Sequence, residues 1–144
     1  RLVNEFAEEH VCCNRGVNGI EGSLSTAAGM SVVSGRIVFC VIGDLSFFYD
    51  QNALWNGNLR GNLRVLLLNN GRGGIFDRLP HLDESAAKEP YVVGAHHTSA
   101  QGICMQNNVT YLRAGSYKEM DEALKTFMQP TADRPIVLEI SFGG

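Results

Sequence analysis

Two polar residues, Asp44 and Asn70, each lie just after a short apolar run and could do chemistry together. Asp44 follows the apolar residues 37–42 after a single glycine, and Asn70 follows the mostly apolar residues 64–68 after one asparagine. The interval between them is long enough for the helix and loops that a crossover between parallel strands requires. Because such crossovers are right-handed, both polar ends leave the carboxyl edge of the sheet, where α/β proteins bind ligands.

The residue types at this edge suit a divalent cation beside a phosphate group. Asp44 offers a carboxylate oxygen, Asn70 offers an amide oxygen, and the glycine-rich turn after Asn70 lets a backbone carbonyl bend inward. Oxygen ligands without Cys or His favour Mg²⁺, which keeps positions for phosphate and water. The amides of Leu45 and Ser46 begin a predicted helix, and helix N-termini attract anions. The pattern predicts a metal–diphosphate site; the alternative is a capping turn and an unrelated Asn-Asn-Gly turn.

The elements that position these residues alternate between strands and helices. We expect helices over residues 23–33, 46–55, 99–106 and 117–128, and strands over residues 37–42, 64–68, 110–113 and 136–140. The run over residues 37–42 is apolar throughout, as in a strand buried on both faces. This order predicts one α/β domain over residues 1–144, with three layers (α/β/α) and a mostly parallel central sheet. Residues 76–95 form a long loop, and such loops are usually functional.

Length and composition exclude several classes of function. The chain has 144 residues and a net charge of −3, so it forms about one domain and offers no basic field for nucleic acid. No apolar run approaches the ~20 residues of a membrane span. The four cysteines lack zinc spacing, so we expect free thiols and a cytoplasmic location. Gly16, Gly19 and Gly22 lack the spacing of a dinucleotide fingerprint, which argues against a nicotinamide cofactor.

The metal–diphosphate pattern resembles the motif of thiamine-diphosphate enzymes, Gly-Asp-Gly followed further along by Asn-Asn. This chain has Leu45 where many members have glycine. Residues 43–46, which include Leu45, and the segments 14–29 and 75–80 together resemble one branch of the family. This branch is the 2-succinyl-5-enolpyruvyl-6-hydroxy-3-cyclohexene-1-carboxylate synthases of menaquinone biosynthesis. The resemblance is dense over residues 1–80 and thin afterwards. It covers only the carboxyl-terminal, diphosphate-binding domain of those enzymes.

The resemblance implies a role for each residue that matches the family's motifs, with no catalytic residue in this chain. The ligands of Mg²⁺ or Mn²⁺ would be the side chains of Asp44 and Asn70 and the backbone carbonyl of Arg72. The residues that would contact thiamine diphosphate are Gly19, Ile20, Gly43, Asp44, Leu45, Ser46, Asn70 and Ile75. The residues that would face the substrates are Arg1 and Arg15, as carboxylate clamps, and Ile75, Phe76 and Leu79, as an apolar wall.

The resemblance also implies a reaction and its partners. Family members decarboxylate 2-oxoglutarate and add the remaining succinyl-semialdehyde unit to isochorismate, with the cofactor carrying the chemistry. Their active sites lie between the subunits of a homodimer or homotetramer, and an acidic residue of an amino-terminal domain activates the cofactor. We therefore expect this chain to be one domain of a larger enzyme and inactive alone. Two alternatives stay open: an acetolactate-synthase-like or decarboxylase-like thiamine enzyme, and a non-catalytic module that binds Mg²⁺ and a diphosphate.

The other polar and reactive residues are expected to have structural rather than functional roles. Without the resemblance, Arg15 would be expected to pair with Glu21 or an exposed acid, and Glu21 itself suits a helix dipole better than a general base. The neighbours His96-His97 are predicted to lie in a solvated loop, because adjacent residues project apart and no third metal ligand is near. The pair Cys12-Cys13 is predicted to pack in the core at the end of a buried strand.

Overall fold

The computed structural model describes residues 11–14, 16, 19–78 and 84–141. The predicted site residues Arg1, Arg15 and Leu79 lie outside this set. The elements in chain order are α1 (Ser23–Val33), β1 (Val38–Gly43), α2 (Asp44–Tyr49), β2 (Leu63–Leu68), α3 (Gln101–Gln106), β3 (Thr110–Ala114), α4 (Tyr117–Phe127) and β4 (Ile136–Ile140). Short helical turns in the connections span Gln51–Trp55, Gly74–Arg78 and Lys88–Val92.

The four strands form one parallel sheet in the order β1-β2-β4-β3. Their carboxyl ends are level, because Gly43 pairs with Leu68, and Ile140 pairs with both Leu68 and Ala114. The residues that follow β1 and β2 therefore leave the sheet side by side. The predicted α/β class is confirmed, and the sheet is parallel throughout the described residues.

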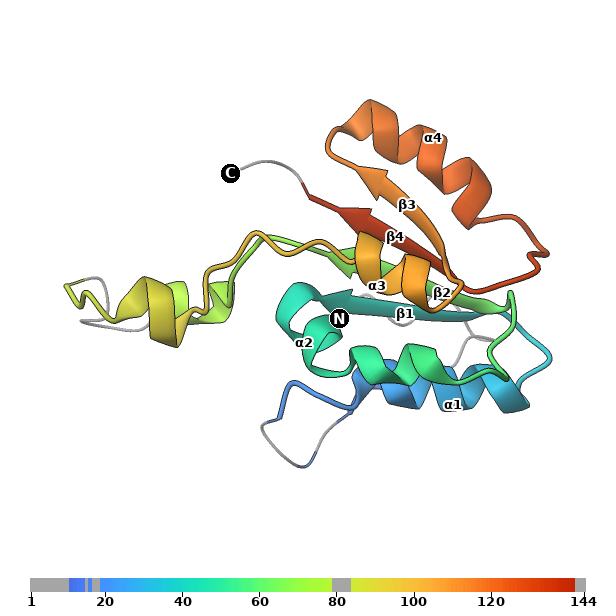
Figure 1. The fold of residues 1–144 in the computed structure, drawn as a ribbon, viewed down its shortest axis with the longest axis horizontal. Coiled ribbons are helices and arrows are strands. Elements are labelled where there is room, and N and C mark those ends of the chain that lie inside the picture. The colour runs from blue at the N-terminus through green and yellow to red at the C-terminus, as the bar shows by residue number, and fades with distance from the viewer. Residues whose placement is uncertain (1–10, 15, 17–18, 79–83, 142–144) are drawn as a thin grey trace.

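Helices cover both faces of the sheet, which confirms the three-layer prediction (Figure 1). On one face α1 and α2 pack against β1 and β2, and α3 packs against β3, around Leu24, Phe47 and Cys104. On the other face α4 packs its apolar stripe, which includes Phe127, against β3 and β4. Burying each large apolar side chain contributes about 1.5–3 kcal/mol to folding. Among the described residues, no helix has the length and apolar character needed to cross a bilayer.

The prediction that the first strand is buried on both faces is wrong for the described structure. Cys40 and Ile42 point into the core, but Phe39 and Val41 are 50% and 65% exposed. The reason is the position of α4, which lies over β3 and β4 rather than over β1. On that face of β1, Phe39 packs only against the ring of Phe127 among the described aromatic residues.

The helix expected over residues 46–55 is broken at Asp50. There α2 ends, and a turn of 3-10 helix follows over Gln51–Trp55. Asp50 is buried, and its carboxylate accepts hydrogen bonds from the Ser25 backbone N–H (2.7 Å) and the Ser25 hydroxyl. A carboxylate at this place offsets the dipole at the start of α1. These hydrogen bonds therefore tie the start of α1 to the end of α2.

All four cysteines are free thiols, as predicted, but the first two lie elsewhere than expected. Cys12 and Cys13 are exposed, and residues 11–14 form no strand, so their predicted core position is wrong. Cys40 and Cys104 are buried. Burial, with a smaller contribution from the Asp50 carboxylate, raises the pKa of Cys40 to about 11. Burial, with a smaller contribution from Glu139, raises the pKa of Cys104 to about 12.

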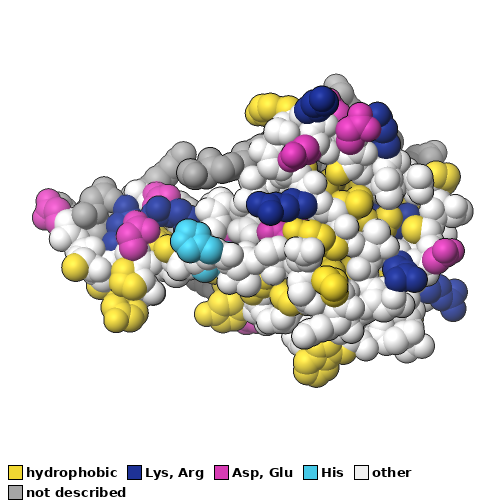
Figure 2. Space-filling model, turned by 45° about the horizontal axis from the view of Figure 1, so that its top comes forward, with side chains coloured by type: hydrophobic (Ala, Val, Ile, Leu, Met, Phe, Trp, Pro, Cys, Tyr) yellow, Lys and Arg dark blue, Asp and Glu magenta, His cyan; other side chains and the backbone are white. Residues whose placement is uncertain are grey.

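Between β2 and α3 the chain leaves the body as an arm, residues 71–78 and 84–98, that extends past the carboxyl edge of the sheet (Figure 1). The Arg72 guanidinium pairs with Asp77 and Glu89 at its base. Figure 2 shows charged side chains of both signs on this arm and histidine where the arm joins the body. The arm therefore carries a mixed charge distribution rather than a field of one sign on the face shown.

A buried arginine links the sheet to the end of α4. Arg64 is fully buried on β2, and burial lowers its pKa. Its Nε donates to the carbonyl of Phe127 (2.9 Å), and its Nη2 donates to the carbonyl of Gln129 (3.2 Å). These carbonyls lie at the C-terminus of a helix, where orphan acceptors and the negative end of the dipole favour a cation.

We expect the substitution Arg64→Met to lower the free energy of unfolding by about 1–3 kcal/mol, because the buried carbonyls lose their donors. Arg60→Met is the control, since Arg60 is exposed, and its effect should stay within about 0.5 kcal/mol. Urea denaturation of both variants measures the difference. Equal midpoints for the two variants would contradict this role of Arg64.

Candidate metal and diphosphate site

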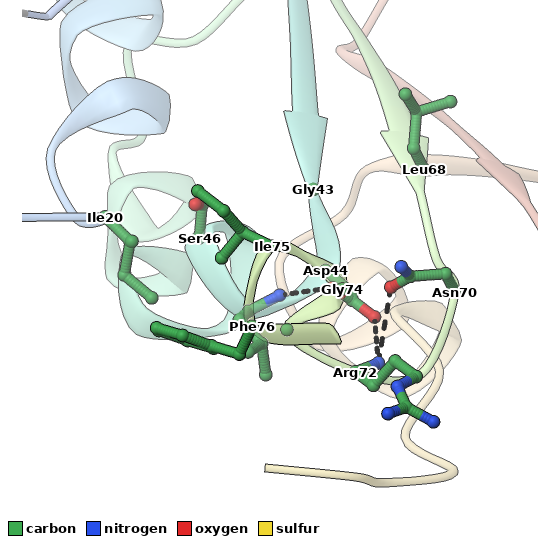
Figure 3. Close-up of a pocket in the computed structure, with 12 residues that line it drawn as sticks. Ile20, Gly43, Asp44, Ser46, Leu68, Asn70, Arg72, Gly74, Ile75 and Phe76 are labelled. Carbon is green, nitrogen blue, oxygen red and sulfur yellow. Dashed lines mark hydrogen bonds between the residues drawn. The ribbon is translucent and has the colours of Figure 1, made fainter. Parts of the chain in front are cut away.

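The carboxyl edge of β1 and β2 brings Asp44 and Asn70 together. Asp44 begins α2 directly after β1 and is 4% exposed. Its Oδ2 accepts a hydrogen bond from the backbone N–H of Arg72 (3.1 Å), and Asn70 Oδ1 accepts from the same N–H (3.2 Å). Figure 3 shows the carboxylate and the amide converging on this one nitrogen. Both oxygens therefore point toward one small region, and metal binding there stays a prediction.

The Asp44 carboxylate is held by backbone donors on both of its oxygens. While Oδ2 faces Arg72, Oδ1 accepts from the backbone N–H of Leu45 (2.8 Å). A buried carboxylate is costly unless hydrogen bonds or a cation compensate its charge. The two N–H donors supply part of that compensation, and a bound divalent cation would complete it.

Asn69 supports the turn that carries Asn70. Its Oδ1 accepts from the Gly71 N–H (3.0 Å), and its Nδ2 donates to the Thr98 carbonyl (2.9 Å) and to Glu139 Oε1 (2.6 Å). The two asparagines thus have different roles. Asn69 fixes the turn, and Asn70 presents its amide oxygen to the region beside Asp44.

Glu139 is a structural residue of this site that the sequence analysis missed. It is 2% exposed on β4. Its Oε2 accepts from the Ser99 hydroxyl (3.0 Å), the Ala100 N–H (3.0 Å) and the Tyr111 hydroxyl (2.8 Å). A lone glutamate inside an apolar strand was the available signal, because a buried carboxylate needs several donors. Glu139 anchors Asn69 to the sheet.

The returning end of the arm lies against the same turn. The Gly73 N–H donates to the Val93 carbonyl (2.6 Å), and the His96 N–H donates to the Gly71 carbonyl (2.8 Å). Gly71 has a φ of +72°, and an added Cβ would lie 2.9 Å from the His96 carbonyl oxygen. Glycine is therefore required there by both backbone conformation and space.

The prediction of a solvated loop is confirmed for His97, which is exposed, and wrong for His96. The His96 side chain is only 16% exposed, and its Nε2 lies 3.3 Å from Asp44 Oδ2. The physical reason is that residues 93–96 fold back onto the turn after β2, a contact that local sequence does not reveal.

The convergent oxygens line a cleft of about 420 Å³, within the range of small-molecule sites. The lining residues are Ile20, Gly43, Asp44, Leu45, Ser46, Leu68, Asn70, Arg72, Gly73, Gly74, Ile75 and Phe76. Most predicted cofactor and substrate residues are among them, whereas Gly19 is exposed and does not line the cleft. Leu68, Gly73 and Gly74 are additions to the predicted set.

An apolar wall and an open floor give the cleft its character. Ile20, Ile75 and Phe76 are 44%, 81% and 37% exposed, and they border the cleft together in Figure 3. An added Cβ at Gly43 would meet no protein atom within 4 Å, so this glycine leaves room in the cleft. The geometry suits a ligand with an apolar part and a polar end.

Arg72 contacts Asp44 and Asn70 through its backbone N–H rather than through its guanidinium. Figure 3 shows its side chain directed away from Asp44 and Asn70. The guanidinium instead pairs with Asp77 and Glu89 in the arm. The Arg72 carbonyl accepts from the Gly74 N–H (3.0 Å). A carbonyl has two lone pairs, so this oxygen can still bind a cation.

The donor set fits magnesium or manganese completed by phosphate and water. Across the part of the chain that the structure describes, no group of three or more His, Cys, Asp or Glu side chains could hold a metal. A cation at this edge would therefore rely on one carboxylate, one amide and a carbonyl, all hard oxygens. Mg²⁺ is commonly bound by one or two carboxylates together with substrate phosphates and several waters.

Comparison with known proteins identifies the family of this chain. Residues 3–140 match the model of a protein family described as thiamine pyrophosphate enzyme, C-terminal TPP binding domain. The chain belongs to this family. The resemblance predicted from the Asp44 and Asn70 motif is thereby confirmed.

Curated relatives share one name. The proteins from Bacteroides thetaiotaomicron (53% identical over 131 residues) and from Bacteroides fragilis (51% over 131 residues) are both named 2-succinyl-5-enolpyruvyl-6-hydroxy-3-cyclohexene-1-carboxylate synthase. Each match covers 90% of this chain and 24% of the relative. A relative of the same name from Flavobacterium psychrophilum is 40% identical over 97% of this chain and 25% of its own length. The chain thus spans about a quarter of the length of these relatives.

A solved structure supports the fold. The thiamine diphosphate-dependent 4-hydroxybenzoylformate decarboxylase from Rhodococcus jostii RHA1 superposes with a TM-score of 0.67 at 22% identity. The match covers 83% of this chain and 22% of that protein. At this identity the likeness shows a shared fold, which confirms the predicted architecture.

We expect Gly71→Ala to loosen the turn after β2 by about 1–3 kcal/mol, because alanine is strained at positive φ and its Cβ meets a backbone oxygen. Hydrogen exchange of the Gly73 and His96 amides should quicken by about 10-fold or more. Gly35→Ala is the control, since a Cβ there meets no atom within 4 Å. Unchanged exchange at both amides in Gly71→Ala would show that the turn tolerates a side chain.

Proposed function

We propose that this chain supplies the metal- and diphosphate-binding part of a 2-succinyl-5-enolpyruvyl-6-hydroxy-3-cyclohexene-1-carboxylate synthase. The enzyme would decarboxylate 2-oxoglutarate and transfer the remaining succinyl-semialdehyde unit to isochorismate in menaquinone biosynthesis. The observation that carries the proposal is the convergence of Asp44 Oδ2 and Asn70 Oδ1 on the Arg72 N–H. The names of relatives 51–53% identical to this chain support the choice among thiamine enzymes.

In this proposal three oxygens hold Mg²⁺ or Mn²⁺: those of the Asp44 carboxylate, the Asn70 amide and the Arg72 carbonyl. The cation and the backbone at the start of α2, at Leu45 and Ser46, would hold the diphosphate of thiamine diphosphate. When bound, this cofactor supplies a nucleophilic carbon and an electron sink for decarboxylation. The chain's own part is to hold the charged end of the cofactor and neutralise it.

We propose that Ile20, Ile75, Phe76 and Leu79 form an apolar wall beside the reacting centre. Loss of CO₂ consumes the negative charge of a carboxylate, so apolar surroundings favour that step. Because both substrates carry carboxylates, we propose that Arg1 and Arg15 bind them with planar, bidentate guanidinium groups.

The partners are proposed from the relatives and from the resemblance. The relatives are about four times as long as this chain, so amino-terminal domains of the same enzyme would complete the site. The enzyme would act as a homodimer or homotetramer, with active sites between subunits. Four free thiols support a cytoplasmic location, because reducing compartments keep cysteines unpaired.

The full-length protein should bind thiamine diphosphate and Mg²⁺ in calorimetric titration, and Asp44→Ala should weaken that binding by at least ~100-fold, or about 2.7 kcal/mol. The reason is the loss of the only carboxylate among the proposed ligands. Asp121→Ala on the exposed side of α4 is the control and should leave the affinity unchanged. Equal heats from Asp44→Ala and the unaltered protein would remove Asp44 as a ligand.

Substrate choice separates the remaining alternatives in the same preparation. The proposal requires consumption of isochorismate together with 2-oxoglutarate. Turnover of pyruvate alone would point to an acetolactate-synthase-like or decarboxylase-like enzyme instead, and cofactor binding without turnover of either would point to a non-catalytic module. The chain of residues 1–144 on its own should show no turnover.

A further inference from the structure

An imidazole from the arm lies beside the Asp44 carboxylate and has no assigned role. His96 Nε2 is 3.3 Å from Asp44 Oδ2, and the His96 side chain is 16% exposed. The Nε2 atom is enclosed by protein, and within the described residues it makes no hydrogen bond. The contact with Asp44 is therefore close in distance but not aligned as a hydrogen bond.

The hydrogen bond at the other ring nitrogen decides where the ring proton lies. Nδ1 of His96 accepts from the Thr98 backbone N–H (3.1 Å). A neutral imidazole that accepts at Nδ1 carries its proton on Nε2. His96 Nε2 therefore carries an N–H donor, and this donor faces the acceptor oxygen Oδ2 of Asp44.

One contact of the ring and two contacts of the backbone around it hold residues 96–98 in this position. The ring's edge-to-face packing on Phe48 of α2 has a centroid distance of 5.4 Å. The His96 N–H donates to the Gly71 carbonyl (2.8 Å), and the Thr98 carbonyl accepts from Asn69 (2.9 Å). The segment that carries the imidazole is thus linked both to α2, which begins with Asp44, and to the turn that carries Asn70.

We propose that His96 is a positioning residue of the metal site, whose Nε2–H holds the Asp44 carboxylate by a hydrogen bond when a divalent cation is bound. The inference rests on the proposed function of this cleft and adds the residue that orients its carboxylate. In this structure Oδ2 accepts from the Arg72 N–H, and a carboxylate that turns toward a cation needs a different donor to keep its direction. His96 supplies that donor and does not touch the cation.

The test is Mn²⁺ binding by the full-length protein with thiamine diphosphate, read from the electron paramagnetic resonance signal of free Mn²⁺. Glutamine places an amide N–H near the position of Nε2, whereas asparagine places its oxygen near the position of Nδ1. We expect His96→Leu and His96→Asn to weaken Mn²⁺ binding by about 10–100-fold, as loss of a ligand's hydrogen-bond partner typically does. His96→Gln should stay within about threefold of the unaltered protein, and the exposed control His97→Leu should match it.

Other outcomes would overturn the inference. Normal Mn²⁺ affinity in His96→Leu would show that Asp44 needs no such donor. Rescue by asparagine but not by glutamine would assign His96 to the Thr98 contact, a purely structural role. An imidazole nitrogen coupling to bound Mn²⁺ would make His96 a ligand instead. If Asp44→Ala binds Mn²⁺ normally in the same assay, the proposed function itself fails, whereas loss in Asp44→Ala with normal binding in His96→Leu removes only this inference.

Discussion

The candidate site depends on the level, parallel pairing of β1 with β2. Gly43 lies opposite Leu68, so the chain leaves both strands at the same height, and Asp44 and Asn70 meet within two residues of the strand ends. A slip of one residue in this register would turn the side chains of β2 to the opposite faces of the sheet. The buried apolar residues of both strands prevent that slip. Core packing thus fixes the positions of the Asp44 and Asn70 side-chain oxygens, although these oxygens do not themselves contribute to the core.

Around these oxygens, residues from distant parts of the chain hold the turn after β2 in one conformation. Glu139 reaches Asn69 from β4, and residues 93–96 return from the arm to bind Gly71 and Gly73. Neither Glu139 nor residues 93–96 line the cleft, yet their contacts limit the positions that Asn70 and Arg72 can take. Such supporting contacts set the precision of a metal site as much as the ligands do.

The parts of the fold that could be predicted from the sequence follow from local patterns. The apolar runs ending at Leu68 and Ile140 mark central strands, and the amphipathic period of residues 117–128 marks α4 within one residue. Asp44 and Asn70 could be brought together because right-handed crossovers constrain where parallel strands end. Local patterns of neighbouring residues and the chirality of the chain are enough to predict these features.

The parts that could not be predicted depend on contacts between distant segments. His96 looks like a loop histidine until the arm folds back, and exposure of Val41 depends on where α4 lies rather than on β1 itself. The apolar pair Cys12-Cys13 suggests a core strand, but a strand forms only where a neighbour pairs with it, and none of the described strands does. Burial depends on the whole fold, so local hydrophobicity predicts it correctly for some apolar residues and wrongly for others, such as Val41 and Cys12.

The central claim is that Asp44 and Asn70 bind one cation, and anomalous diffraction from crystals of the full-length protein grown with Mn²⁺ and thiamine diphosphate tests it most directly. We expect a single manganese peak at ligand distance, about 2.1 Å, from both side-chain oxygens. A peak that contacts only one of the two residues, or that lies at another edge of the sheet, would contradict it.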